Sequence, residues 1–472
     1  MKKLFLFFFI AFNLNAGTHI VTSNADDGEG SLRKIVADAN ANDTIIFASN
    51  INQVTLTTGH IRINKSITII GKENEKTIIS GNNNSKIFMY YDSNVVFNIR
   101  NLILENGYST YRAGAVDMYN DNYSINNAVL IAIDCVFKNN NGQGGAITVF
   151  YANNIAIVTN CLFDKNKSIE GAGGAAGIVG GNFIAISCSF NKNEPNSSIS
   201  AFHNANLILI NNTFERNSAV YYGGAVSLIN NVNAYLYHNT FDMNQADSGG
   251  AILHSLLLPY PPYYSLCTLY TYNSIYTANE EKGVISEAGQ IRGKISGGKN
   301  LIENGTTITR DSVFGNNEYK DGFIMPTAFA KKAERLTTMD IANPVGIMTD
   351  DSIINLLITD QINYKRPDTG FVTYGAIEYD STYGIKADGS FDILVLPNPT
   401  DRDFNIIFDN PREQKITIDL VDIEGKIVLN IFDGVASAGW QVYRVKDKLA
   451  SSVYFVKFAI KDNIFIRKVV VK

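Results

Sequence analysis

Residues 155–166 read IAIVTNCLFDKN, and this stretch decides the fold. Apolar side chains alternate along it as far as Phe163, and Asn166 follows that phenylalanine by three residues. The same pattern occurs five times, in steps of 26, 27, 24 and 27 residues, with its phenylalanines at Phe137, Phe163, Phe190, Phe214 and Phe241. A repeat of roughly 20–50 residues is typical of a solenoid, in which each unit buries its apolar face against its neighbours.

The alternation with a period of two predicts a β-strand with one buried face in every unit. In the first unit we expect Ile131, Ile133 and Cys135 to share the buried face with Phe137. No helical pattern separates the units, so the sequence predicts an all-β parallel β-helix rather than a βαβ array. Residues 54–300 would hold roughly ten coils of about 25 residues each, stacked about 4.8 Å apart.

Two columns of side chains are expected to run through the coils. The first column lies two positions before each phenylalanine and contains Cys135, Cys161, Cys188, Asn212 and Asn239. The second lies three positions after each phenylalanine and contains Asn140, Asn166, Asn193, Asn217 and Asn244, which can hydrogen-bond as a ladder. We predict that the three cysteines are buried free thiols, because parallel Cβ vectors would strain a disulfide between coils. No cysteine spacing indicates a zinc site.

Composition and the N-terminus indicate an exported protein. Hydrophobic residues make up 45% of the chain, charged residues 18%, and the formal net charge is −5. No basic run stands out, so nucleic acid is not an expected partner. Lys2, Lys3 and the apolar residues after them predict a signal peptide over residues 1–16, cleaved between Ala16 and Gly17. No later stretch is long and apolar enough to predict a transmembrane span.

The two ends of the solenoid need caps. At the first end, Ser31 is expected to begin a short helix, and a strand is expected over residues 44–47. Ser31-Leu32-Arg33, residues 37–40 and the stretch from Asp43 to Phe47 resemble the CSLREA-type motif of secreted bacterial β-helix proteins. Gly30 and Lys34 stand where that motif has Cys and Glu. The resemblance implies a right-handed, pectin-lyase-like solenoid.

At the far end, residues 360–378 resemble the closing segment of bacterial β-helices that carry a choice of C-terminal anchors. Arg366 and Glu378 are interpreted there as a structural ion pair rather than as catalytic groups. The composition changes after Asp380. The predicted organisation is a signal peptide over 1–16, an N-terminal cap over 17–53, the β-helix over 54–380, a linker over 381–390 and a sorting domain over 391–472.

Residues 391–472 predict a β-sandwich of immunoglobulin-like type with about seven short strands. They resemble the type A sorting domain of the type IX secretion system, with Ser452 in place of a usual glycine. The motif residues in the expected order are Pro397, Asn398, Pro399, Gly425, Lys426, Tyr454, Lys468 and Lys472. The resemblance implies entry into the periplasm by the leader and export through the type IX machinery. It also implies a secreted or outer-membrane surface-attached product, often held by lipopolysaccharide.

Parallel β-helices often serve polysaccharide lyases and glycoside hydrolases, so candidate catalytic residues matter. A hydrolase needs two carboxylates, and Asp164 and Glu215 hold equivalent positions after their phenylalanines, in a column interpreted as a solvated, variable turn. A calcium-dependent lyase needs an acidic cluster. The repeats contain none, so we predict no catalytic residue, metal ligand or cofactor, and calcium has no support. His203, His238 and His254 are interpreted as surface residues.

One insertion is a candidate ligand contact. Residues 256–264 read LLLPYPPYY, and Tyr260, Tyr263 and Tyr264 are suited to stack on sugars or contact a protein, unless this loop packs back as a lid. The favoured interpretation is a non-catalytic, adhesin-like module that binds a glycan or protein. The alternatives are a divergent lyase or hydrolase acting on an acidic glycan, and a spacer. An enzyme requires at least three clustered charged residues on adjacent coils, whereas a binding groove would be lined by Asn, Ser, Thr and Tyr.

Overall fold

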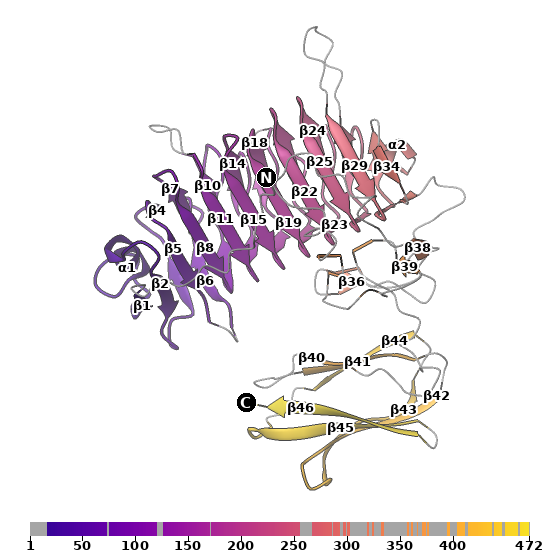
Figure 1. The fold of residues 1–472 in the computed structure, drawn as a ribbon. Coiled ribbons are helices and arrows are strands. Elements are labelled where there is room, and N and C mark those ends of the chain that lie inside the picture. The colour runs from indigo at the N-terminus through magenta and orange to yellow at the C-terminus, as the bar shows by residue number, and fades with distance from the viewer. Residues whose placement is uncertain are drawn as a thin grey trace, which may run out of the picture. The chain divides into compact units, whose positions relative to one another are not determined.

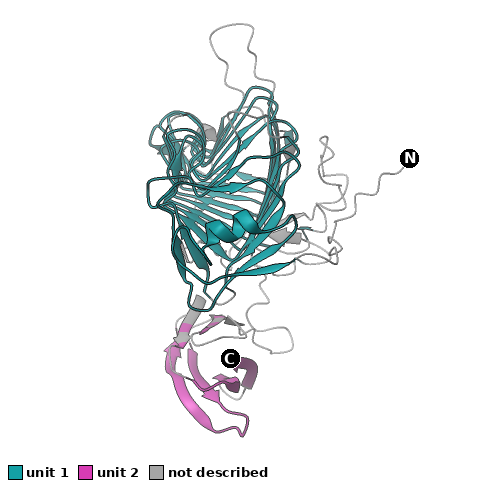
Figure 2. Cartoon of the chain, turned by 90° about the vertical axis from the view of Figure 1, so that its left-hand side faces the viewer, with its two compact units in different colours: residues 1–378 teal, residues 379–472 magenta. Residues whose placement is uncertain are grey.

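The chain forms two compact units, residues 1–378 and residues 379–472, each of which is described by itself (Figure 2). The computed structural model describes residues 17–72, 75–119, 126–169, 171–254, 267–285, 287–292, 296–298, 300–302, 319–320, 323–324, 332–334, 356–357, 360–361, 366, 371–373, 375–376, 394–396, 404–410, 414–436, 439–445, 449–460 and 463–471.

The first unit is a parallel β-solenoid built from three sheets (Figure 1). One coil runs through β15 (Ile155–Thr159), β16 (Leu162–Asp164) and β18 (Ala176–Val179), and the chain then enters the next coil at β19 (Asn182–Ile186). Each strand pairs in parallel with its counterpart one coil away, so that Ile155 lies beside Asn182. Among the described residues the sheets hold eleven, ten and nine strands, in agreement with the predicted roughly ten coils.

The strands of the three sheets are as follows. The first sheet contains β1 (Thr18–Val21), β2 (Thr44–Phe47), β5 (Ile67–Ile70), β8 (Val96–Arg100), β11 (Val129–Ile133), β15, β19, β22 (Asn206–Ile210), β25 (Asn233–Tyr237), β29 (Thr268–Tyr272) and β34 (Ser296–Gly298). The second contains β3 (Gln53–Thr55), β6 (Thr77–Ser80), β9 (Leu102–Glu105), β12 (Val136–Lys138), β16, β20 (Ser189–Asn191), β23 (Thr213–Glu215), β26 (Thr240–Asp242), β30 (Ile275–Thr277) and β35 (Leu301–Ile302). The third contains β4 (Ile61–Ile63), β7 (Phe88–Tyr90), β10 (Val116–Met118), β14 (Ile147–Phe150), β18, β21 (Ile199–Phe202), β24 (Val226–Ile229), β28 (Ile252–His254) and β33 (Ile291–Arg292).

Shorter elements complete this unit. They are β13 (Asn141–Gly142), β17 (Lys167–Ser168), β27 (Gln245–Ala246), β31 (Glu280–Glu281), β32 (Val284–Ile285), α2 (Glu287–Gln290), β36 (Tyr319–Lys320), β37 (Phe323–Ile324), β38 (Lys332–Glu334) and β39 (Phe371–Thr373).

The predicted alternation holds within each strand but not across the corner between the first and second sheets. In β11 the buried side chains are Leu130 and Ala132, whereas Ile131 and Ile133 point outward, contrary to the prediction. The reason is the next residue, Asp134, which has a φ of 55° and turns the chain sharply. After that turn Cys135 and Phe137 are buried as expected. Even-numbered residues are therefore buried before this corner and odd-numbered residues after it, so alternation cannot be counted across the turn.

The phenylalanines form one continuous stack in the core. Neighbouring rings from Phe137 to Phe241 have centroids 4.5–4.8 Å apart and are nearly parallel, with interplanar angles of 3–7°. Tyr276 continues the stack at 4.8 Å from Phe241, and Asn279 follows it by three residues. The repeat thus has a sixth copy, with tyrosine in place of phenylalanine.

Both predicted side-chain columns are confirmed. In the second column, Nδ2 of Asn166 donates to Oδ1 of Asn193 at 3.0 Å, and the same contact recurs from Asn140 through Asn279. The first column places Cys135, Cys161 and Cys188 in buried positions as free thiols. It continues with Asn212 and Asn239, where Nδ2 of Asn212 donates to Oδ1 of Asn239 at 3.0 Å. These columns hold polar groups inside the core with their hydrogen bonds satisfied.

The helix after Ser31 and the strand over residues 44–47 that were expected at the N-terminal end are both present. Helix α1 (Leu32–Asp38) begins at Ser31, whose hydroxyl accepts from the backbone N–H of Lys34 at 3.2 Å. Leu32 and Val36 are buried against the solenoid core. Figure 2 shows α1 lying across the end of the stacked coils. The apolar face of this helix covers the exposed edge that a solenoid would otherwise present to water.

A segment near the end of the first unit lies back on the coils, and we call its described residues 356–357, 360–361, 366 and 375–376 the strap. Leu357 packs on the outward apolar side chains of the first sheet, including Ile208 and Tyr237. Arg366 is buried and donates to Oδ1 of Asn211 at 3.1 Å and to the carbonyl of Gly375 at 3.0 Å. Glu378, its predicted ion-pair partner, lies outside the described residues.

The second unit consists of two antiparallel sheets whose facing side chains form one core, which fits the predicted sandwich. The predicted hairpin around Gly425 and the predicted last hairpin, between β45 and β46, are both present. The described strands are β40 (Leu394–Leu396), β41 (Phe404–Asn410), β42 (Gln414–Val421), β43 (Ile427–Ala436), β44 (Gly439–Val445), β45 (Ser452–Ile460) and β46 (Asn463–Val471).

Candidate binding site

The corner between the first and second sheets presents one outward side chain per coil. We call this set the corner column, and each member has a φ between 50° and 56°: Asn101, Asp134, Asn160, Ser187, Asn211, His238 and Asn273. Asparagine and aspartate tolerate this left-handed conformation better than most residues. The preference explains why small polar side chains gather along this edge.

The strap divides the corner column into a covered part and an open part. Asn211, His238 and Asn273 are at most 2% exposed. The amide N–H of Gly375 donates to the carbonyl of Asn273 at 2.7 Å. Asn160, by contrast, is exposed. The border between the two parts falls at Ser187.

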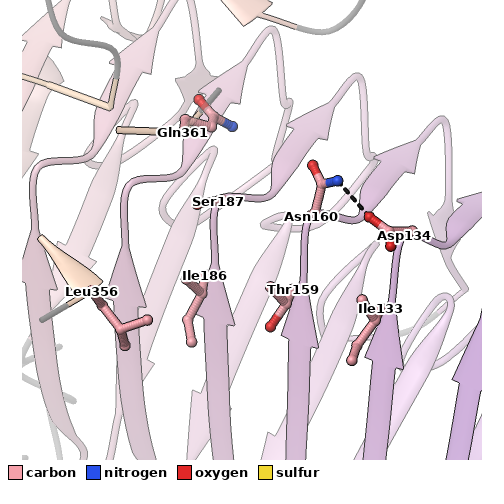
Figure 3. A pocket seen from close by; sticks show the side chains of 8 residues that line it. All are labelled: Ile133, Asp134, Thr159, Asn160, Ile186, Ser187, Leu356 and Gln361. Carbon is pink, nitrogen blue, oxygen red and sulfur yellow. Dashed lines mark hydrogen bonds between the residues drawn. The ribbon is translucent and has the colours of Figure 1, made fainter. Parts of the chain in front are cut away.

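A pocket of about 260 Å³ lies at this border (Figure 3). Its lining comes from three adjacent coils and from the strap, namely Ile133, Asp134, Thr159, Asn160, Ile186, Ser187, Leu356 and Gln361. The Gln361 side chain is anchored, because its Oε1 accepts from the Thr213 hydroxyl at 2.6 Å and its Nε2 donates to the Cys188 carbonyl at 2.7 Å. The strap wall of the pocket is therefore held in place by buried hydrogen bonds.

The chemistry of the pocket is amphiphilic. Ile133, Ile186 and Leu356 supply apolar surface, while Thr159, Asn160, Ser187 and Gln361 supply hydroxyl and amide groups. Asp134 is the one carboxylate of the lining, and its Oδ1 accepts from Nδ2 of Asn160 at 2.5 Å. Such a lining can donate to and accept from hydroxyl groups while an apolar face lies on the isoleucines.

The pocket lacks a second carboxylate in its lining, and the acidic pair elsewhere on the coils is buried. Glu215 and Asp242 lie side by side on β23 and β26, at 1% and 0% exposure. The interpretation of this column as a solvated turn is wrong, since its members lie in strands and the exposure falls from Lys138 and Asp164 to the buried Glu215 and Asp242. Glu215 also contacts the guanidinium of Arg216 at 2.6 Å. The pair therefore does not face an open groove.

The prediction that His238 and His254 lie on the surface is wrong. His238 and His254 are buried, at 2% and 3% exposure, rather than on the surface. His238 belongs to the covered part of the corner column, and its Nε2 lies 3.2 Å from Nδ2 of Asn273. Within the described ranges, no three His, Cys, Asp or Glu side chains form a group able to hold a metal ion.

The predicted tyrosine contacts Tyr260, Tyr263 and Tyr264 lie outside the described residues. The tyrosines that follow them are described. Tyr270 stacks on Tyr235 with centroids 5.3 Å apart, and Tyr272 stacks on Tyr237 at 5.9 Å. These rings continue the outward apolar face of the first sheet, which begins upstream at Ile155 and Ile157.

The sorting-motif residues of the second unit are partly described. Gly425 has a φ of 82°, and its N–H donates to the carbonyl of Asp422 at 3.0 Å, which explains a glycine at this turn. Lys426 and Lys468 are exposed. Tyr454 is buried, with its hydroxyl donating to the carbonyl of Ala450 at 3.0 Å. Ala16, Pro397, Asn398, Pro399 and Lys472 lie outside the described residues.

The fold and the second unit together define a β-solenoid protein with a C-terminal β-sandwich domain. Residues 394–472 match the family described as secretion system C-terminal sorting domain. This domain directs export through the type IX secretion machinery, which makes the chain a secreted or cell-surface-attached protein. No curated protein matches the sequence. In the described part of the chain, no helix is both long and apolar enough to cross a membrane.

Proposed function

We propose that the solenoid is a non-catalytic, adhesin-like module that binds a glycan at the cell surface. The chain enters the periplasm by a leader cleaved between Ala16 and Gly17, passes the type IX machinery, and is then released or held on lipopolysaccharide. The CSLREA-like cap and the choice-of-anchor-like closing segment support a surface role, because both occur in secreted β-helix proteins.

The observation that carries the binding proposal is the lining of the pocket at the border of the strap. Amide and hydroxyl groups of Thr159, Asn160 and Ser187 share the lining with apolar side chains, and Asp134 is a hydrogen-bond acceptor there. A sugar presents hydroxyl groups on its rim and C–H groups on its faces, so it matches such a lining. The lining also has the character expected of a binding groove rather than of an enzyme, since it holds a single charged residue.

The test is retention of the purified full chain on a panel of uronate and neutral polysaccharides, with wild type and Asn160→Ala compared. Truncation removes an amide donor and its contact to Asp134, and we expect affinity to fall about tenfold, equivalent to 1.4 kcal/mol. Asn127→Ala is the matched control. Asn127 also has a left-handed backbone and bonds through Nδ2 to an exposed neighbour, Asn94. Equal loss in both variants, or retention on no polysaccharide, would refute the pocket as a sugar site.

The second candidate is a divergent polysaccharide lyase or glycoside hydrolase acting on an acidic glycan. The observation in its favour is that the coils carry two adjacent carboxylates, Glu215 and Asp242, although both are buried and would need to become accessible to a substrate. Release of unsaturated or reducing sugar from the same panel, with and without calcium, tests it. Turnover that is lost in Glu215→Gln would establish the enzyme and displace the binding module.

A further inference from the structure

The geometry points to a second role for the cleavage between Ala16 and Gly17: removal of the leader creates an α-ammonium group on Gly17 that Asp43 binds, which locks the N-terminal cap. This inference rests on the proposed cleavage position. It is independent of whether the pocket binds a glycan.

Gly17 is already placed against Asp43. Its backbone nitrogen donates to Oδ1 of Asp43 at 2.6 Å. The carbonyl of Gly17 accepts from the N–H of Thr44 at 2.8 Å, and Thr18 pairs with Thr44 at the start of β1 and β2. The strand register therefore fixes the nitrogen of Gly17 beside this carboxylate.

Asp43 is a buried carboxylate, exposed by only 1%. Its Oδ2 accepts from the backbone N–H of Asn40 at 2.8 Å and lies 2.7 Å from Nε2 of His19. Burial by itself raises the pKa of Asp43, but the hydrogen bonds from His19, Asn40 and Gly17 outweigh it and lower the pKa below its usual range. Asp43 is therefore ionised at neutral pH, and a buried charge gains most from an opposite charge nearby.

Cleavage changes the donor from neutral to charged. Hydrolysis of the Ala16–Gly17 peptide bond adds water across it, leaving a carboxylate on Ala16 and an amine on Gly17. An α-amino group has a pKa of about 7.7–8.0 and is mainly protonated at neutral pH. Charge-assisted hydrogen bonds are roughly twice as strong as neutral ones. The same nitrogen thus binds Asp43 more tightly after processing than before it.

The space around Gly17 fits this role. A Cβ atom at this position would lie 3.2 Å from Oδ1 of Asp43 and 3.3 Å from Nε2 of His19, closer than ordinary contact. A larger residue would push the new ammonium away from its partner. Glycine thus suits both the cleavage and the subsequent ion pair.

The consequence concerns the first strand of the solenoid. β1 forms the outer edge of the first sheet and pairs only with β2 among the described strands. An ion pair at Gly17, the residue directly before β1, fastens that edge. The cap of the unprocessed chain lacks this ion pair, so leader removal completes the end of the solenoid.

The test is a four-member cycle on the chain through Lys472. Two chains start at Gly17 or retain Ala16 before it, and each is made with Asp43 or with Asp43→Asn. The readouts at pH 7.0 are amide hydrogen exchange over Thr18–Val21 and reactivity of the α-amine toward an acylating reagent. We expect at least tenfold slower exchange with the free Gly17 amine than with Ala16 retained, and only when Asp43 is present. We also expect slower acylation of Gly17 than of Ala16.

Two controls keep the outcomes distinct. Asp38→Asn removes an exposed carboxylate of the same cap, paired with Lys34, and should leave the difference between the two N-termini unchanged. Acetylation of Gly17 removes its charge without touching Asp43, so it should abolish the protection even if Asp43→Asn does not fold. Equal exchange for free and acetylated Gly17 would overturn the ion pair. Sequencing of the exported protein that finds another N-terminus would overturn the cleavage premise, while leaving the glycan proposal intact.

Discussion

Asn193 and Asn217 lie one coil apart inside the solenoid, with Nδ2 of the first 3.0 Å from Oδ1 of the second. That oxygen also accepts from the backbone N–H of Asn193 at 3.0 Å. The Nδ2 of Asn193 donates again, to the carbonyl of Phe163 at 3.0 Å. Each asparagine therefore links three successive coils by hydrogen bonds. A hydrophobic side chain could not replace its amide, because it can neither donate nor accept these bonds.

Replacing Asn193 with Leu should destabilise the solenoid by about 3–5 kcal/mol, because several buried groups then lose their partners at about 1–3 kcal/mol each. Among them are Nδ2 and the backbone N–H of Asn166, both 3.0 Å from Oδ1 of Asn193. Urea unfolding of the full chain measures the loss. The exposed Asn84 provides the control variant, Asn84→Leu, which should change the free energy of unfolding by less than about 0.5 kcal/mol. Similar losses in both would contradict the ladder.

Acid should weaken the N-terminal cap through Asp26. Burial raises the pKa of Asp26, but hydrogen bonds from Thr58, Arg33 and Thr57 outweigh that and lower the pKa to about 2. The folded-state value lies below the unfolded value of about 3.9. The stabilisation is therefore present above pH 4 and is lost as the pH falls toward 2, on the order of 1–2 kcal/mol.

Unfolding free energies of wild type and Asp26→Asn, measured between pH 6 and about pH 2.5, check this prediction. The wild type should lose more stability over that interval than the variant, so the difference between them should shrink as the pH falls. A difference that stays constant with pH would show that the carboxylate of Asp26 does not titrate in this way.

The cysteines of the first column should resist thiol reagents in the folded protein. Burial raises the pKa values of Cys135 and Cys161 well above the usual thiol range, and the thiolate is the reactive form. We expect no labelling of Cys135, Cys161 or Cys188 by a maleimide at pH 7.5 until urea is added. Cys267 is partly exposed and serves as the internal positive control. Labelling of all four at equal rates would refute buried thiols.

The strap should detach when Arg366 is shortened. Lysine at this position keeps the charge but cannot reproduce the planar contacts to Asn211, Gly375 and Ala376. We expect a loss of about 2–4 kcal/mol for the buried group. Hydrogen exchange should also become faster at the amide of Ala376, which donates to the Thr240 hydroxyl at 3.0 Å. The exposed Arg100→Lys should leave that amide protected, and equal exchange in the two variants would argue against a role of Arg366 in holding the strap.

The coils and their core can be predicted from the sequence, whereas the exposure of their outer surface cannot. Phenylalanine spacing predicts the stack and both columns, because each coil contacts only its neighbours and the repeat reports that contact directly. The count of alternate residues failed at Asp134, since a single left-handed residue shifts the phase. The sixth copy at Tyr276 departs from the repeat, because an insertion lengthens its step from Phe241 to 35 residues and tyrosine replaces phenylalanine.

The pocket and the burial of His238 could not be predicted from the repeat, because both depend on the strap. Leu356 and Gln361 complete the pocket, and the bond from Nδ2 of Asn211 to the carbonyl of Leu356 spans 145 residues. Nothing local in the repeat indicates which coils the strap will cover. Exposure of the corner column is therefore a property of tertiary structure. Residues of the same type are buried where the strap covers them and exposed where it does not.

The stacked Phe190 and Phe214, together with the amides beside them, make every junction between coils nearly interchangeable. Duplicating or deleting one whole coil would join surfaces that already fit, and would change the length in increments of about 4.8 Å. If the change is made in the coils before Cys188, helix α1 and the strap would keep the hydrogen-bond partners they have now. The length of the solenoid can thus change without a change in its capping helix or strap. Duplication of one repeat in the gene would be enough, and no new core packing would be needed.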